Sequence, residues 1–116
     1  RYRQAAAILE KLQSDIGAYC ILLVNVLGQT IIRQGDAASL PLSEIVTLLG
    51  GGIATLTQAG RALDGAKDTI NLIYRESSKY HLYGLNVGED LLMVILIANT
   101  EFSSPLGSVW YYARRI

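Results

Sequence analysis

Residues 43–64 read SEIVTLLGGGIATLTQAGRALD, a segment that repeats apolar side chains at helical spacing for roughly six turns but carries glycine in its middle. Close approach of another backbone is the usual compensation for glycine in a helix. We therefore expect a helix that packs against a neighbour. The helix contains four glycines, Gly50, Gly51, Gly52 and Gly60. Each lowers helix stability by about 1 kcal/mol relative to alanine, so together they cost about 3–4 kcal/mol.

The two sides of this helix differ in composition. The apolar side is formed by Ile45, Leu49, Ile53, Leu56 and Leu63, flanked by Val46, Leu48 and Ala59. A solvated helix face normally collects Lys, Glu and Asp, but the opposite side has small or uncharged residues and one charge. We therefore expect a partner to cover it. That side is formed by Thr47, Gly50, Gly51, Ala54, Thr57, Gln58 and Arg61.

Length and composition limit the classes of protein to consider. The 116 residues predict a single domain over residues 1–116, with one hydrophobic core. Ten basic and ten acidic residues cancel, so no net charge attracts the chain to nucleic acid or to an anionic membrane. The hydrophobic fraction of 51% is high for so small a domain, which favours burial of some apolar surface by a partner.

The sequence has no pattern typical of membrane insertion or secretion. The longest apolar run, Leu91–Ala98, is too short to cross a bilayer as a helix, and the first residues carry no signal peptide. Cys20 is the only cysteine, which excludes an internal disulfide and fits a reducing compartment. We expect a cytoplasmic protein.

Hydrophobic periodicity divides the remaining sequence into helices and strands. Ala5–Ile16 has helical spacing and ends at Gly17, and Ser103 is the predicted start of a last helix. Ser43 is the predicted N-cap of the glycine-bearing helix. The predicted strands are Tyr19–Val26, Thr30–Arg33, Thr69–Arg75, Tyr80–Val87 and Leu91–Ala98.

This order of elements predicts an α+β domain of three layers. The chain runs helix, strand, strand, helix, strand, strand, strand, helix, and short turns make successive strands antiparallel neighbours. Leu91–Ala98 is the most apolar strand, so we place it near the centre of a five-stranded sheet. Apolar residues on both strand faces need cover on both. We expect the central helix on one face and the two terminal helices on the other.

Candidate catalytic residues are scarce. His81 is the only histidine and lies mid-strand, and Cys20 belongs to a strand whose two faces are apolar. A metal site needs several His, Cys or carboxylate ligands together, and none is evident. The Gly50–Gly52 run lacks the Lys-Ser/Thr of a phosphate-binding loop. We therefore expect no enzyme, no cofactor and no metal.

The order of elements, the small-residue helix and the segment from Cys20 to Gly35, CILLVNVLGQTIIRQG, resemble the roadblock/dynein light chain family. The resemblance extends from Ala5 to Arg115. It implies a homodimer in which the third strands pair edge to edge and the two central helices lie side by side. Prokaryotic members bind a Ras-like small GTPase through that helical face, and the gliding-motility member activates its GTPase. Other members scaffold dynein or signalling complexes.

In this sequence the resemblance places the dimer and partner interface on the small-residue side of the central helix and on the third strand. No arginine finger is required of this domain in the family. The expected interface residues are Thr47, Gly50, Gly51, Ala54, Thr57, Gln58, Arg61, Ile70, Leu72 and Tyr74.

A sensory domain of the PAS or GAF type is the alternative, because these folds also wrap a five-stranded antiparallel sheet in helices. Such a domain needs a pocket with polar groups among apolar ones. The candidate polar residues would be Asn71, His81 and Asn86, which are scattered along the sequence. A small molecule that co-purifies with the protein would favour this alternative.

Overall fold

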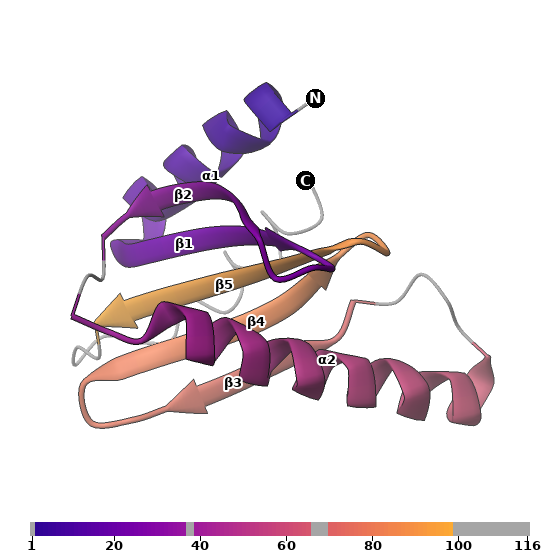
Figure 1. Ribbon diagram of the computed structural model, residues 1–116. Coiled ribbons are helices and arrows are strands. Elements are labelled where there is room, and N and C mark those ends of the chain that lie inside the picture. The colour runs from indigo at the N-terminus through magenta and orange to yellow at the C-terminus, as the bar shows by residue number, and fades with distance from the viewer. Residues whose placement is uncertain (1, 37–38, 66–69, 99–116) are drawn as a thin grey trace.

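The computed structural model describes residues 2–36, 39–65 and 70–98. Within these ranges the chain forms two helices and one five-stranded antiparallel sheet, shown in Figure 1. The strand order across the sheet is β2-β1-β5-β4-β3. The elements are α1 (Tyr2–Ile16), β1 (Ala18–Asn25), β2 (Thr30–Gly35), α2 (Leu42–Asp64), β3 (Leu72–Glu76), β4 (Tyr80–Val87) and β5 (Leu91–Ala98).

The predicted fold class and the order of these elements are confirmed. β5 lies in the centre of the sheet, as its apolar sequence predicts, and its side chains from Leu92 to Ile97 are all buried. β2 and β3 are the two edge strands. The helix predicted from Ser103 onward lies outside the described residues.

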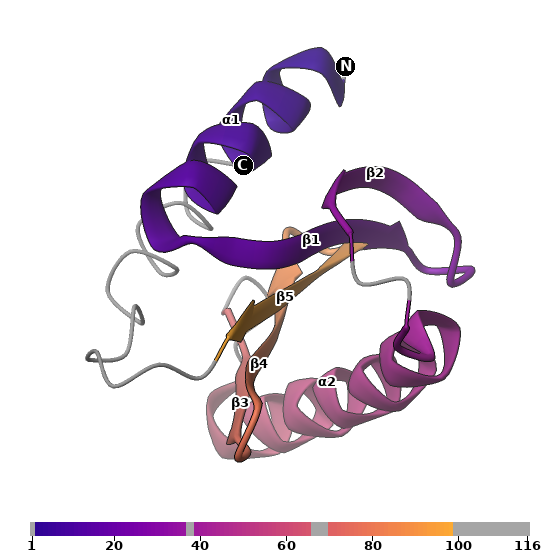
Figure 2. The same ribbon diagram turned by 90° about the vertical axis from the view of Figure 1, so that its left-hand side faces the viewer.

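The first helix covers one face of the sheet. Leu9 and Leu12 of α1 are fully buried and belong to one hydrophobic core with Tyr83, Met93 and Ile95 of the sheet. The side chains of β4 on this face alternate with those on the other face, because successive residues of a strand point to opposite sides. Figure 2 looks along the sheet and shows α1 and α2 on its opposite sides, as predicted for the first and central helices.

The second helix covers the other face. Val46, Leu49 and Ile53 of α2 are buried against Leu22 of β1 and Val94 of β5. Gly84 of β4 allows this close packing, because a Cβ atom at that position would lie 3.0 Å from Leu49 Cδ2. The apolar stripe in the first half of α2 therefore packs on the sheet as its spacing predicts.

Some element ends differ from the prediction. Ser43 is not the N-cap of α2: the helix begins at Leu42, Pro41 occupies the cap position, and no side chain caps it. The Pro41 carbonyl accepts from the Ile45 amide at 3.1 Å, so the first helical hydrogen bond forms before the serine. β3 begins only at Leu72 rather than Thr69, and β2 continues to Gly35.

The apolar side of α2 is buried only in part. Figure 1 shows that α2 extends well past the ends of the strands. Leu63 on this projecting part is 85% exposed, Leu56 is 37% exposed, and Leu48 near the start of the helix is 68% exposed. A 23-residue helix spans about 35 Å and an eight-residue strand about 26 Å, so the helix outruns the sheet.

Candidate functional site

Most of the predicted interface residues of α2 lie on its surface away from the sheet. We call this the outer surface of α2, and it is formed by Thr47, Gly51, Ala54, Gln58 and Arg61, all exposed. It carries one charged side chain over about four helical turns. No described element covers it, so the uncharged composition is not explained by packing within the described part of the chain.

Gly50 and Thr57 are also predicted interface residues. Both are half-buried, on the side of α2 that faces the ends of strands β1 and β4. The Thr57 hydroxyl donates to the Ile53 carbonyl at 2.9 Å and accepts from Asn71 Nδ2 at 3.2 Å. Thr57 is thus bound to its own protomer rather than directed outward.

The glycines of α2 have two different environments. A Cβ atom on Gly52 would lie 2.5 Å from Cδ1 of Ile73 in β3, so this glycine permits close packing inside the protomer. A Cβ atom on Gly50, Gly51 or Gly60 would meet nothing within 4 Å. The predicted close approach therefore exists within the protomer only at Gly52, and an external neighbour remains a prediction for Gly51.

The predicted interface residues of the third strand lie at the edge of the sheet. Ile70 and Leu72 are half-buried and pack on the α1 face. Tyr74 is 40% exposed. These side chains and the outer surface of α2 are on opposite faces of the sheet, so they do not form one patch. They meet only along β3, beyond which the described residues form no further strand.

The exposure of Leu48, beside this edge, was not predicted from the sequence. Leu48 lies one turn before Gly52, which packs on β3, so both are on the same stripe of α2. The apolar character of Leu48 predicts a place in the core. Hydrophobicity alone could not reveal its exposure, because that depends on where the sheet edge lies beneath the helix.

His81 and Cys20 have structural environments. His81 is buried on β4, and its Nδ1 lies 2.6 Å from the Tyr74 hydroxyl. Partial desolvation, with a smaller contribution from the Glu76 carboxylate, raises the pKa of Tyr74. Burial raises the pKa of the Cys20 thiol, which favours the unreactive protonated form. Neither arrangement supplies a nucleophile beside a base.

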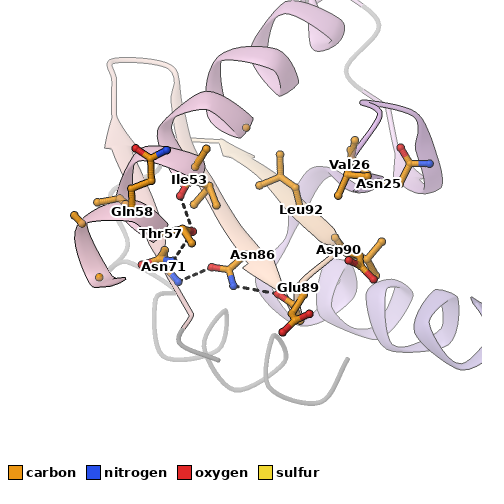
Figure 3. A pocket seen from close by; sticks show the side chains of 18 of the residues that line it. Asn25, Val26, Ile53, Thr57, Gln58, Asn71, Asn86, Glu89, Asp90 and Leu92 are labelled. Carbon is orange, nitrogen blue, oxygen red and sulfur yellow. Dashed lines mark hydrogen bonds between the residues drawn. The ribbon is translucent and has the colours of Figure 1, made fainter. Parts of the chain in front are cut away.

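An open groove runs beside α2 at the end of the sheet where β1 and β4 finish. It measures about 1110 Å³ and lies between α2 and the turns that join β1 to β2 and β4 to β5. We call it the strand-end groove, and Figure 3 shows it from close by. Val26, Gln58 and Glu89 are among the side chains that line it.

A chain of hydrogen bonds crosses this groove. The Asn71 amide N–H donates to Asn86 Oδ1 at 2.6 Å, and Asn71 Nδ2 donates to Thr57. Asn86 Nδ2 donates to the Gly88 carbonyl at 3.3 Å. The chain is visible in Figure 3 and links α2, the start of β3 and the end of β4. These amides hold the fold together here and are engaged with one another.

The polar residues considered for a sensory pocket do not converge. Asn71 and Asn86 meet on the α2 side of the sheet. His81 shares its strand face with Tyr83, which packs in the core beneath α1, so it lies on the opposite side. A single pocket that uses all three side chains is therefore impossible in this fold.

Metal-ligating side chains are dispersed over the described part of the chain. Within residues 2–36, 39–65 and 70–98, no three His, Cys, Asp or Glu side chains gather closely enough to hold a metal ion. Neither helix of these ranges has the length and apolarity needed to cross a bilayer.

No protein-family model matches the sequence, and no curated protein matches it. Solved structures do match. MglB of Myxococcus xanthus is 21% identical with a TM-score of 0.75, covering 97% of this chain and 91% of that one. A gliding protein MglB from Thermus thermophilus is 24% identical with a TM-score of 0.72, covering 98% and 83%. A Roadblock/LC7 domain from Streptomyces avermitilis is 14% identical with a TM-score of 0.70, covering 95% and 92%.

Another of these structures is described as MglB with a tetrameric arrangement. It is 24% identical to this chain, with a TM-score of 0.74. At identities this low, the likeness concerns the path of the backbone rather than the residues of any interface.

Proposed function

Since the chain has the roadblock/LC7 fold that the sequence resemblance implied, we propose that it is a non-catalytic homodimeric interaction module of the cytoplasm that binds and regulates a Ras-like small GTPase. Alternatively, the same module would serve as a scaffold for a larger signalling or motor complex. One observation carries it: a long helix, whose outer surface has a single charged side chain and is covered by no described element, lies next to an edge strand of the sheet.

The open edge supports the dimer. β3 exposes a row of backbone N–H and C=O groups, and such edges associate unless charge, proline or a covering element blocks them. Pairing of two β3 strands across a two-fold axis would join two five-stranded sheets into one. It would also bring both α2 helices to the same face of the combined sheet, with Leu48 facing the partner helix.

The outer surface of α2 supports the binding of a protein partner. Small side chains such as Gly51 and Ala54 allow a partner to approach the helix closely, and uncharged side chains lower the cost of removing water. In the roadblock family, prokaryotic members use the corresponding helical face to bind a Ras-like GTPase. We propose the same use here.

Regulation would not involve a catalytic residue from this chain. Arg61 is the one cationic side chain on the outer surface of α2. An arginine finger would have to reach the nucleotide, and Arg61 lies near the end of the helix beside the strand-end groove. We propose that the module acts by holding switch segments of the GTPase in one conformation.

The test uses purified protein and a Ras-like GTPase from the same genome. Light scattering should give the mass of a dimer at micromolar concentration. Calorimetry should show a micromolar dissociation constant for one nucleotide state, GDP or a non-hydrolysable GTP analogue, and at least about tenfold weaker binding of the other. A monomer, or absence of binding in both nucleotide states at about 100 µM, would refute the proposal.

A further inference from the structure

The strand-end groove has an unusual wall. The turn between β1 and β2 presents Val26 and Leu27 to the groove, and these side chains are 76% and 79% exposed. Turns are normally built from Gly, Pro, Asn, Asp and Ser. Two adjacent large apolar side chains at a turn are costly to leave in water, at about 1.5–3 kcal/mol each relative to full burial.

This turn is held in one conformation by hydrogen bonds that do not use the apolar side chains. Asn25 Oδ1 accepts from the amides of Leu27 and Gln29, both at 3.0 Å. Asn25 Nδ2 donates to Gln29 Oε1 at 3.0 Å, and the Gly28 amide donates to the Asn25 carbonyl. The exposed side chains are therefore displayed on an ordered support, which lowers the entropic cost of binding.

The opposite wall is also apolar. Leu63 and Leu56, on the part of α2 that extends past the sheet, line the same groove. Exposed apolar side chains thus occur on two elements that are far apart in sequence and face one space. Exposed apolar side chains that line one groove mark an interaction site more often than scattered single residues do.

The rim of the groove is acidic. Among the described residues that line it, Asp64, Glu89 and Asp90 carry negative charge, against Arg61 alone. Glu89 and Asp90 form the exposed turn between β4 and β5, and neither makes an ion pair with another described residue. A chain with zero net charge therefore has a local negative rim around an apolar floor.

We propose that the strand-end groove binds an amphipathic segment of a partner protein that combines apolar side chains with lysine or arginine. The apolar side chains would enter between Val26 and Leu27 on one wall and Leu63 on the other, as anchors of a groove-bound helix do. The basic side chains would reach Glu89 and Asp90 at the rim. The charges steer association and select the partner, and the apolar contacts supply most of the affinity.

A small molecule is a poorer match for this site. The groove is open and larger than the roughly 300–1,000 Å³ that is typical of small-molecule pockets. Its inner amides, Asn71 and Asn86, are hydrogen-bonded to each other and to neighbouring groups rather than directed into the space. The groove shares one wall with the outer surface of α2, because Thr47, Ala54, Gln58 and Arg61 also line it. Its apolar anchors Val26, Leu27 and Leu63 lie outside that surface and outside β3, so variants of these anchors test the groove separately from the proposed dimer and GTPase.

The probe is a synthetic helical peptide of about 18 residues made of leucine and lysine, with leucine at i, i+3, i+4 and i+7. A matched peptide replaces every lysine with glutamate. Fluorescence anisotropy should show saturable binding of the lysine peptide at low salt and at least about tenfold weaker binding of the glutamate peptide. Raising the salt concentration should weaken the lysine complex.

Two variants assign the binding to the groove. Val26→Ser combined with Leu27→Ser should weaken the binding of the lysine peptide by at least about tenfold, because both apolar anchors are removed. Glu89→Gln combined with Asp90→Asn should reduce the difference in affinity between the lysine peptide and the glutamate peptide. Tyr19→Ser is the control, because Tyr19 is also exposed, at 49%, but does not line the groove.

The controls include the folded state of each variant. The turn variants keep the backbone and Asn25 hydrogen bonds, so circular dichroism and the melting temperature should stay close to those of the parent protein. Equal binding of both peptides, or unchanged binding by the turn variant, would overturn the proposal. A lower molecular mass of the turn variant would do so too, because a second copy of the chain would then occupy the groove.

Discussion

The substitution Gly51→Leu tests whether the outer surface of α2 is covered by a partner or exposed to solvent. It should lower stability in the first case and raise it in the second. Gly51 is exposed, and a Cβ atom there meets nothing within 4 Å. In an isolated protomer the substitution only raises helix propensity, by about 0.8 kcal/mol. A protomer with a free outer surface should therefore melt about 2–5 °C higher.

If a second copy covers Gly51, the same side chain enters a packed interface. Overpacking of this kind costs about 1–3 kcal/mol, and a two-fold dimer contains the substitution twice. The dimer is then weakened by about 2–6 kcal/mol, which corresponds to about thirtyfold to twenty-thousandfold in its dissociation constant. A loss of that size converts a tight dimer to monomer at micromolar concentration.

The measurement is sedimentation or light scattering over a range of concentrations, paired with thermal unfolding of each variant. Gly60→Ala is the matched control, because Gly60 lies on the same helix with open space around it but not on the outer surface. It should raise stability by about 1 kcal/mol without changing the mass. A Gly51→Leu protein with raised stability and unchanged mass would refute the reasoning.

Three other substitutions test the fold and the proposed function. Gly84→Ala should cost about 1–3 kcal/mol by pressing on Leu49, and in a chemical-denaturation cycle Leu49→Ala should relieve part of that cost; strict additivity would contradict the close contact. Gly65→Ala should destabilise by about 1 kcal/mol, read from the denaturation midpoint, because Gly65 ends α2 at φ 71°. Arg61→Ala should weaken GTPase binding modestly and leave any stimulated hydrolysis at saturating protein within about tenfold, whereas a thousandfold loss would identify Arg61 as an arginine finger.

The order of elements could be predicted from sequence because it depends on local patterns. β4 and β5 begin and end where the apolar runs and turn residues predict. The central position of β5 follows from a run that is apolar on both faces. Prediction of the ends was weaker: Ser43 was the expected N-cap of α2, but the helix begins at Leu42 with Pro41 in the cap position.

The site could be predicted only in part. The uncharged outer surface of α2 follows from helical periodicity, and Gly51 and Ala54 are exposed on it as expected. The strand-end groove was not predicted. It brings together Val26, Leu63 and Glu89, which are far apart in the chain, and no local pattern records that proximity.

The sequence by itself determined which residues form helices and strands, and which stripe of α2 is apolar, because both follow from the geometry of a single element. Tertiary structure decided how far that stripe is buried. Leu49 and Leu63 have the same hydrophobicity and lie on the same side of the helix, yet one is 6% and the other 85% exposed. The difference arises because burial requires a second element beneath the residue, and the sheet under α2 ends before the helix does.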